Sequence, residues 1–156
     1  MRLGEALTKR ADLQKRIAQL TGRIQASAVV QEGDAPPEDP SALLGQLAEM
    51  AAELERLITA INLTNAASRL PDGRTITEAL AQRDVLALRQ AVLRSAADSV
   101  AQASARYSRS EIRLARQIDV AAMRREIDDL ARQIRELDTT IQEHNWTTEL
   151  LQDASR

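Results

Sequence analysis

The sequence predicts an all-α protein of one domain, residues 1–156, folded as an elongated four-helix bundle made of two duplicated antiparallel hairpins, residues 3–66 and 75–151. Four long segments carry apolar residues at alternating steps of three and four, the spacing of helices that pack on other helices. Aromatic residues make up 1% of the chain, so the core must consist of aliphatic side chains, which suit closely packed helices. Short motifs also recur in the same order in both halves.

The first helix is expected from residue 3 to about residue 26. Leu13, Ile17, Leu20 and Ile24 follow the helical spacing, and Arg10 interrupts this apolar series. The stretch QEGDAPPEDP, residues 31–40, excludes a continuous helix because it holds a glycine and three prolines. The first hairpin therefore turns here.

The second helix is expected from residue 40 to about residue 66. Asp39 is placed to cap its N-terminus, and Pro40 suits its first helical position. Leu43, Leu47 and Leu54 continue the apolar spacing. The segment LPDGRT, residues 70–75, then predicts a turn.

The third helix is expected from residue 76 to about residue 105. Thr75 and Glu78 have the spacing of a capping box, in which the two side chains satisfy free amides at a helix start. This helix carries two apolar stripes. A helix that is apolar on two sides has neighbours on both, which predicts a homodimer or a larger closed assembly. The stripes comprise Leu80, Leu86, Leu93 and Val100 on one side and Val85, Leu88, Val92 and Ala96 on the other.

The fourth helix is expected from residue 120 to residue 144, with Asp119 as its cap. Before it, Ile112, Leu114 and Ile118 alternate with polar residues, which is the period of an extended strand. We expect residues 111–118 and residues 28–31 to form a short β ribbon, either with each other or with a second subunit. Such a ribbon needs support from the helices.

Two motifs indicate an internal duplication. EALTKR at residues 5–10 recurs as EALAQR at residues 78–83, and NLT at residues 62–64 recurs as NWT at residues 145–147. Antiparallel hairpins would bring the early motif of each half to the end where its late motif lies. The resulting candidate polar cluster comprises Glu5, Arg10, Asn62, Thr64 and Asn65 in the first half and Glu78, Arg83, His144, Asn145, Thr147 and Thr148 in the second.

Two readings of this polar cluster remain open. Arg10 and Arg83 occupy apolar positions, so their charges must be paired, reach solvent or contact an anion. The first reading is a network of salt bridges and hydrogen bonds that fixes helix pairing. The second is a site for a small molecule or an anion. No metal site is expected at His144, because the residue three positions before it is Ile141 rather than Glu, and Trp146 is expected to be a packing anchor.

The locally basic stretch at residues 106–116 is a candidate basic patch. A functional and a structural interpretation of it both remain open. It could meet phosphate, nucleic acid or an acidic partner, or it could be a solvated connection balanced by the acidic residues 31–40. The net charge of the chain is -2, so we expect no nucleic-acid partner. The patch consists of Arg106, Arg109, Arg113 and Arg116.

Several classes of function lack their sequence signals. There is no Cys, which excludes disulfides, thiol catalysis and thiolate metal sites. With 5 Gly in the chain there is no glycine-rich phosphate loop, and no window reaches the roughly 18 to 20 apolar residues of a membrane span. The start of the sequence lacks the apolar stretch of a secretory signal. We therefore expect a cytoplasmic protein without a cofactor and without enzymatic activity.

Three blocks of the sequence resemble a bacterial family of small helical proteins of unknown function, some of which are named septicolysin. The blocks are INLTNAASRLPDGRTITEALAQRDVLALR, ARYSRSEIRL and the terminal HNWTTELL, within a resemblance that covers nearly the whole chain. The resemblance implies an all-helical, oligomeric protein with no established activity. The family name itself suggests membrane lysis.

These observations favour a self-associating helical scaffold or interaction protein whose partner is a second copy of itself. Two alternatives stay open. One is a membrane-active protein of the lysin kind, and the other is a small-ligand or enzymatic site at the polar Asn-x-Thr ends of the bundle.

Overall fold

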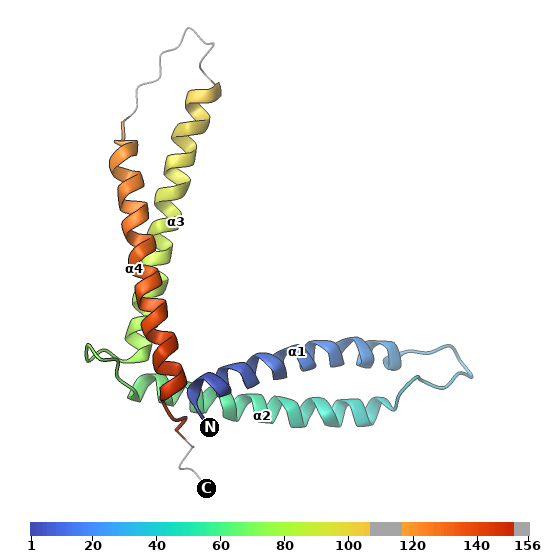
Figure 1. The fold of residues 1–156 in the computed structure, drawn as a ribbon. Helices are drawn as coiled ribbons and strands as arrows, with labels where there is room; N and C mark the ends of the chain where they lie inside the picture. The colour runs from blue at the N-terminus through green and yellow to red at the C-terminus, as the bar shows by residue number, and fades with distance from the viewer. Residues whose placement is uncertain (107–116, 152–156) are drawn as a thin grey trace. The chain divides into compact units, whose positions relative to one another are not determined.

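The computed structural model describes residues 1–106 and 117–151, and this part of the chain contains four helices (Figure 1). Their order along the chain confirms the predicted all-α fold, and their bounds lie within a few residues of the predicted ones. The helices are α1 (Leu3–Ala28), α2 (Pro40–Ala67), α3 (Ile76–Arg106) and α4 (Val120–Thr147).

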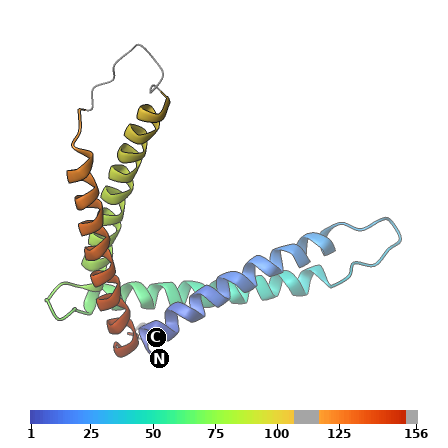
Figure 2. The same cartoon turned by 45° about the horizontal axis from the view of Figure 1, so that its top comes forward.

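The chain divides into two compact units. The first contains Met1–Ser68 together with the segment that begins at His144, and the second is Arg69–Glu143. In the first unit α1 and α2 lie side by side and antiparallel, and in the second α3 and α4 do the same (Figures 1 and 2). Each unit is thus built on one helical hairpin.

The predicted single-residue caps are present. Asp39 Oδ1 accepts a hydrogen bond of 3.0 Å from the Ser41 amide at the start of α2. Asp119 Oδ1 accepts bonds of 2.9 and 3.0 Å from the amides of Ala121 and Ala122 at the start of α4. The Ala122 amide holds the pKa of Asp119 below its usual range, since it bonds the charged carboxylate.

The predicted capping box opens α3. The Thr75 amide donates to Glu78 Oε2 at 2.7 Å, and the Glu78 amide donates to Thr75 Oγ1 at 3.1 Å. The preceding turn closes through a bond of 2.7 Å from the Leu70 amide to the Arg74 carbonyl. Gly73 has φ of 88° in this turn, a conformation that side chains beyond glycine rarely adopt.

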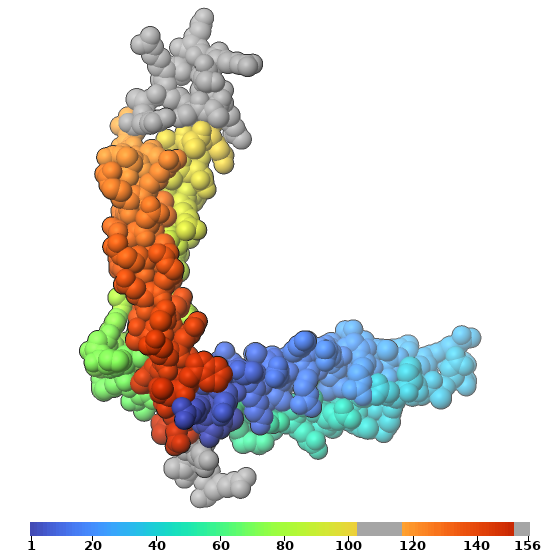
Figure 3. Space-filling view, viewed as in Figure 1, coloured from blue at the N-terminus to red at the C-terminus, as the bar shows by residue number. Residues whose placement is uncertain are grey.

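The atoms of α1 and α2 touch along the first hairpin (Figure 3), and its core consists mainly of leucine side chains. These residues recur at helical spacing, so each helix buries one face. Fully burying a side chain of this size contributes about 1.5–3 kcal/mol. The buried aliphatic residues of the two helices include Leu13, Leu20, Leu43, Leu57 and Ile61.

The second hairpin has the same kind of core. Leu86 from α3 and Met123, Leu130 and Leu137 from α4 are buried. Polar contacts also join the two helices. Gln90 Nε2 donates to the Ile127 carbonyl at 3.1 Å, and Arg89 Nη2 lies 2.7 Å from Glu126 Oε1.

The predicted β strand at residues 28–31 is wrong. Ala28 is the last residue of α1, residues 29–31 have no strand partner among the described residues, and the Val29 side chain is 85% exposed. The helical pattern of α1 extends this far because Ser27 still lies on its buried face. Residues 111–116 of the other predicted strand lie outside the described residues.

Candidate functional site

The segment after α4 pairs with the start of α1 in the first unit. The Leu3 amide donates to the Thr148 carbonyl, and the Leu150 amide donates to the Met1 carbonyl, each at 2.9 Å. Arg2 and Glu149 face each other between these bonds as an antiparallel bridge. Residues 1–3 and 148–150 therefore form a short antiparallel pairing between the two ends of the described chain.

Thr64 joins the end of α2 to the same segment. Its side chain is fully buried, its hydroxyl donates to the Ala60 carbonyl at 2.7 Å, and its Oγ1 accepts a bond of 2.9 Å from the Leu151 amide. A buried hydroxyl costs little when both its proton and its oxygen are bonded. Among the Asn-x-Thr residues of α2, the structure buries Thr64, half-buries Asn65 and leaves Asn62 exposed.

Trp146 packs on the start of α1, in the anchoring role that the sequence predicts. A Cβ atom added to Gly4 would lie 2.9 Å from two carbons of the indole ring, so glycine is what allows this contact. The Arg2 side chain also donates from Nη1 to the Trp146 carbonyl at 2.6 Å. Trp146 is nevertheless 55% exposed.

The two glutamates of the predicted polar cluster serve as caps. Glu5 Oε2 accepts a bond of 2.8 Å from the Arg2 amide, as Glu78 does from the Thr75 amide. The bond from the Thr75 amide lowers the pKa of Glu78. Both carboxylates therefore stabilise helix starts at positions 73 residues apart.

Arg83 is paired within the second unit. Its guanidinium donates to Asp84 Oδ1 at 2.8 Å and lies 3.6 Å from Asp138 Oδ1 on α4. The hydrogen bond to Asp84 is the main reason that the pKa of Arg83 is raised above the ordinary arginine value. The sequence predicted that the charge of Arg83 needs a partner. It did not identify Asp138 as that partner, because the two residues are 55 positions apart.

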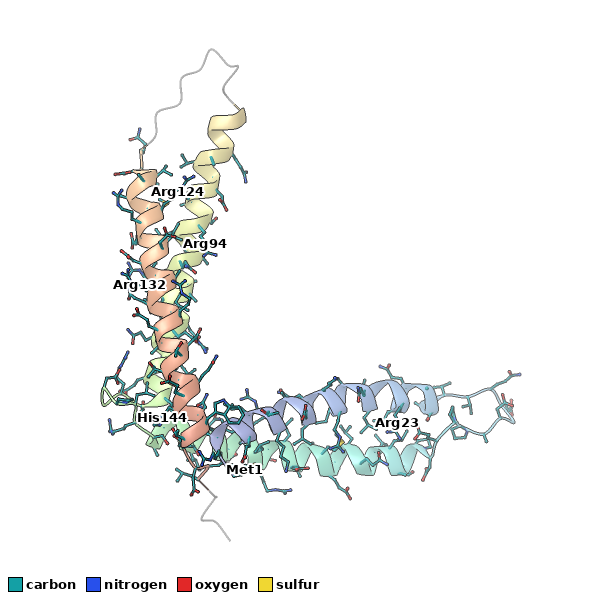
Figure 4. The ribbon with its side chains drawn as sticks, viewed as in Figure 1. Met1, Arg23, Arg94, Arg124, Arg132 and His144 are labelled. Atoms are coloured by element: carbon teal, nitrogen blue, oxygen red, sulfur yellow. The ribbon has the colours of Figure 1, made fainter. Side chains whose placement is uncertain are left out.

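Three polar atoms of the predicted cluster are buried without a hydrogen-bond partner in the described part of the chain. They are Arg10 Nε, His144 Nε2 and Asn145 Oδ1, all in the first unit. His144 lies near the C-terminal end of α4, where Figure 4 labels it. A small polar ligand would satisfy such atoms, so this observation keeps the ligand reading of the cluster open.

A shallow cavity of about 220 Å³ lies in the second unit, beside the turn that precedes α3. Asp72 and Arg74 line it and pair with each other, and Gln82, Gln133 and Glu136 complete its polar wall. None of the site residues predicted from the sequence lines this cavity. Within the described residues, no group of three or more His, Asp or Glu side chains is arranged to hold a metal ion.

The second apolar stripe of α3 lies at the protein surface. Val85, Leu88 and Val92 are 58%, 65% and 60% exposed, whereas Leu86, on the other stripe, is buried against the hairpin core. We call the full row of this face the α3 seam. It comprises Ala81, Val85, Leu88, Val92, Ser95 and Ser99.

The candidate basic patch falls largely beyond what the structure shows. Arg106 is the last residue of α3, and Arg109, Arg113 and Arg116 lie outside the described residues. Elsewhere the arginines are spread along the helices, as Arg94 on α3 and Arg124 and Arg132 on α4 illustrate in Figure 4.

Comparison with known proteins places the chain in a family. Residues 10–150 match the model of the "Family of unknown function (DUF6847)". The chain belongs to this family. The resemblance noted from the sequence was to a family of unknown function, and DUF6847 is such a family. No curated protein matches the sequence.

One solved structure resembles this DUF6847 chain over nearly its full length. It is the crystal structure of a functionally unknown conserved protein from Corynebacterium diphtheriae, with 37% sequence identity and a TM-score of 0.91. The match covers 97% of this chain and 99% of that chain.

None of the helices in the described residues is long and apolar enough to cross a membrane.

Proposed function

We propose that this DUF6847 protein is a non-enzymatic helical scaffold that self-associates through the α3 seam. The observation that carries the proposal is the row of large aliphatic side chains, Val85, Leu88 and Val92, on the exposed face of a long helix. Such a row on one face of a helix is typical of a surface that packs on another helix. Burying these side chains would favour association by about 1.5–3 kcal/mol each when burial is complete.

The two hairpins provide an internal comparison for this surface. α1 and α3 both begin with a glutamate that bonds the amide three residues before it. α1 and α3 also bury residues at the same number of positions after these glutamates or before them. The matching buried pairs are Leu3 and Ile76, Ala6 and Ala79, and Leu13 and Leu86.

On the outer face the two helices differ. At the positions that match Val85, Leu88 and Val92, α1 carries the exposed residues Asp12, Lys15 and Gln19. The hairpin itself therefore does not require an apolar outer face. This difference supports the view that the apolar face of α3 serves an interaction that the face of α1 does not.

The polar residues also support a structural role. Glu5 and Glu78 cap helices, and Thr64 binds the segment after α4. These side chains are occupied by bonds that stabilise the fold.

A charge placed on the α3 seam tests the proposal. Leu88→Asp would put a carboxylate in the middle of the contact, and we expect it to convert the assembly to single chains in sedimentation equilibrium. Ala87→Asp is the matched control, because Ala87 is the exposed neighbour that lies off the seam. Equal masses for wild type and Leu88→Asp at every concentration would reject self-association through this face.

A small-ligand site in the first unit is the second candidate, favoured by the buried atoms Arg10 Nε, His144 Nε2 and Asn145 Oδ1. The chain has 1 His, so its imidazole signals in an NMR spectrum report on this region alone. We would titrate inorganic phosphate and acetate separately while following these signals. Saturable shifts with either anion would support a site, and unchanged signals at millimolar concentration would reject an anion site of useful affinity.

Membrane activity is the third candidate, and the exposed apolar face of α3 is the observation that bears on it. Dye-filled vesicles of anionic phospholipid would release their contents if α3 inserted this face into the bilayer surface. Absence of leakage at micromolar protein would reject this candidate.

A further inference from the structure

We infer that the α3 seam pairs in parallel and in register with the α3 seam of a second copy of the chain. This inference rests on the proposed self-association and adds its orientation and register. The occupant of the exposed face is thus an identical helix, lying in the same direction.

The spacing of the α3 seam supports a two-stranded coiled coil. Its six residues follow one another at steps of four, three, four, three and four, and none of them is charged. In heptad terms Val85 and Val92 occupy a positions and Leu88 occupies the d position between them. A β-branched residue at a with leucine at d favours two parallel strands over higher assemblies.

Small residues continue the seam beyond these three. Ser95 and Ser99 lie next to Ala91 and Ala96, and together with Val92 they line an open depression of about 550 Å³ on this helix. Side chains of this size let a second backbone approach closely. The α3 seam can therefore follow a partner helix over about five turns.

The charges that flank the seam select the orientation. Asp84 occupies a g position and Arg89 the e position five residues later, and in a parallel pair such residues lie beside each other across the interface. Asp84 of each copy would then face Arg89 of the other, which gives two ion pairs related by the twofold axis. Two-fold pairing uses the same patch on both copies, as isologous interfaces do.

Both side chains are available for this contact. Asp84 is 68% exposed, and the bonds it accepts from Arg83 go to Oδ1. Arg89 is 58% exposed and bonds Glu126 through Nη2, while a guanidinium has five N–H donors in all. Neither residue needs to leave its partner within the chain to meet the second copy.

An antiparallel pair would bring like charges together. The antiparallel register that keeps Leu88 against Val92 of the second copy places Arg89 beside Arg89 and Asp84 beside Asp98. Like charges at flanking positions disfavour a pairing. The apolar row permits both directions, whereas the flanking charges permit the parallel one.

Single engineered cysteines test the orientation, because the chain has 0 Cys and every disulfide must then join two copies at known positions. We expect the full-length Leu88→Cys variant to form a covalent dimer under oxidised glutathione. In an equimolar mixture of Leu88→Cys and a size-tagged Val92→Cys, disulfides between like positions should exceed mixed ones. Disulfide formation requires Cα atoms within about 7 Å, so it reports register.

The outcomes separate the inference from the proposed function. Predominantly mixed disulfides would mean an antiparallel pair, which overturns the inference and leaves self-association standing. Absence of any cross-link from a protein that sediments as a dimer would place the contact elsewhere and overturn both. A wild-type protein that sediments as single chains would reject the proposed function itself.

Reversing the flanking charges gives an independent test. Asp84→Arg or Arg89→Asp alone should weaken the dimer roughly tenfold, since each replaces two attractive pairs by two repulsive ones. The double variant should recover most of this loss because the pairs are restored with their signs exchanged. Single reversals that leave the dissociation constant unchanged would contradict the proposed Asp84 to Arg89 contact.

Discussion

At the scale of single residues, Thr64 shows how one side chain can hold distant parts of the first unit together. Its hydroxyl is fully buried and bonds both the Ala60 carbonyl in its own helix and the Leu151 amide beyond α4. The sequence singled out this threonine for its Asn-x-Thr motif. It did not identify Leu151, since the two residues are 87 positions apart.

We expect Thr64→Val to lower the free energy of unfolding by about 1 kcal/mol, because valine keeps the shape of threonine and leaves the Leu151 amide without its acceptor. Thr64→Ser is the control, since it keeps the hydroxyl. Urea unfolding of the three proteins measures the difference. A Thr64→Val protein as stable as wild type would show that the bond contributes nothing.

Gly4 and Trp146 form a second contact that can be tested at one residue. In Gly4→Ala the added methyl group would meet the indole ring at 2.9 Å, and the half-exposed ring can move away. Alanine favours a helix over glycine by about 1 kcal/mol, which offsets the lost contact. We therefore expect a small change in stability and a red shift in the fluorescence of the chain's 1 Trp.

Gly22→Ala is the matched control for this prediction. Gly22 lies in the same helix, and nothing within 4 Å would meet its added methyl group. We expect this variant to gain about 1 kcal/mol in stability with unchanged tryptophan emission. An unchanged emission spectrum in Gly4→Ala as well would mean that the indole does not pack on Gly4.

At the scale of the elements, local chemistry explains where the helices begin. Asp39, Thr75 and Asp119 act within three residues of their own positions, so their roles could be predicted from the sequence. The partner of Arg83 on α4 could not, because it depends on how two helices meet. The strand predicted at residues 28–31 is wrong because the helical pattern of α1 extends to Ala28 and residues 29–31 form no strand.

The capping box of α3 predicts a dependence of stability on pH. Bonds from the Thr75 amide and hydroxyl lower the pKa of Glu78 in the folded protein. The carboxylate therefore stabilises the fold at pH values above its unfolded pKa, and this contribution is lost as pH falls through the lowered folded pKa. We expect the difference in unfolding free energy between wild type and Glu78→Gln to shrink below about pH 4.3.

Chemical denaturation at a series of pH values checks this prediction. Glu49→Gln, on the exposed surface of α2, is the control for loss of a carboxylate outside a cap. A wild-type advantage over Glu78→Gln that stays constant from pH 7 to pH 3 would contradict the proposed role of the charged form.

α3 also marks the limit of what the sequence predicts about function. Its two apolar stripes could be read from the spacing, and the sequence predicts a neighbour for each. The structure supplies α4 for the stripe that contains Leu86 and leaves the stripe of Val85, Leu88 and Val92 exposed. The exposure of this second stripe could not be predicted from the sequence, because the spacing alone does not tell which stripe α4 covers.

At the scale of the whole molecule, the chain joins two hairpins that bury matching positions and differ on one outer face. The fold class followed from helical spacing, the aliphatic composition and the caps. The roles of the residues in the candidate polar cluster were harder to predict from the sequence. Its glutamates cap helices, whereas Arg10, His144 and Asn145 keep buried polar atoms without partners in the described residues. The α3 seam is the feature on which the proposed function depends.

The molar mass of the unmodified protein in solution tests that proposal most directly. We expect light scattering on a chromatography column to give twice the chain mass of 17.2 kDa at micromolar concentration, and the Leu88→Asp variant to give 17.2 kDa. A wild-type mass of 17.2 kDa that persists as the concentration is raised a hundredfold would contradict self-association through α3.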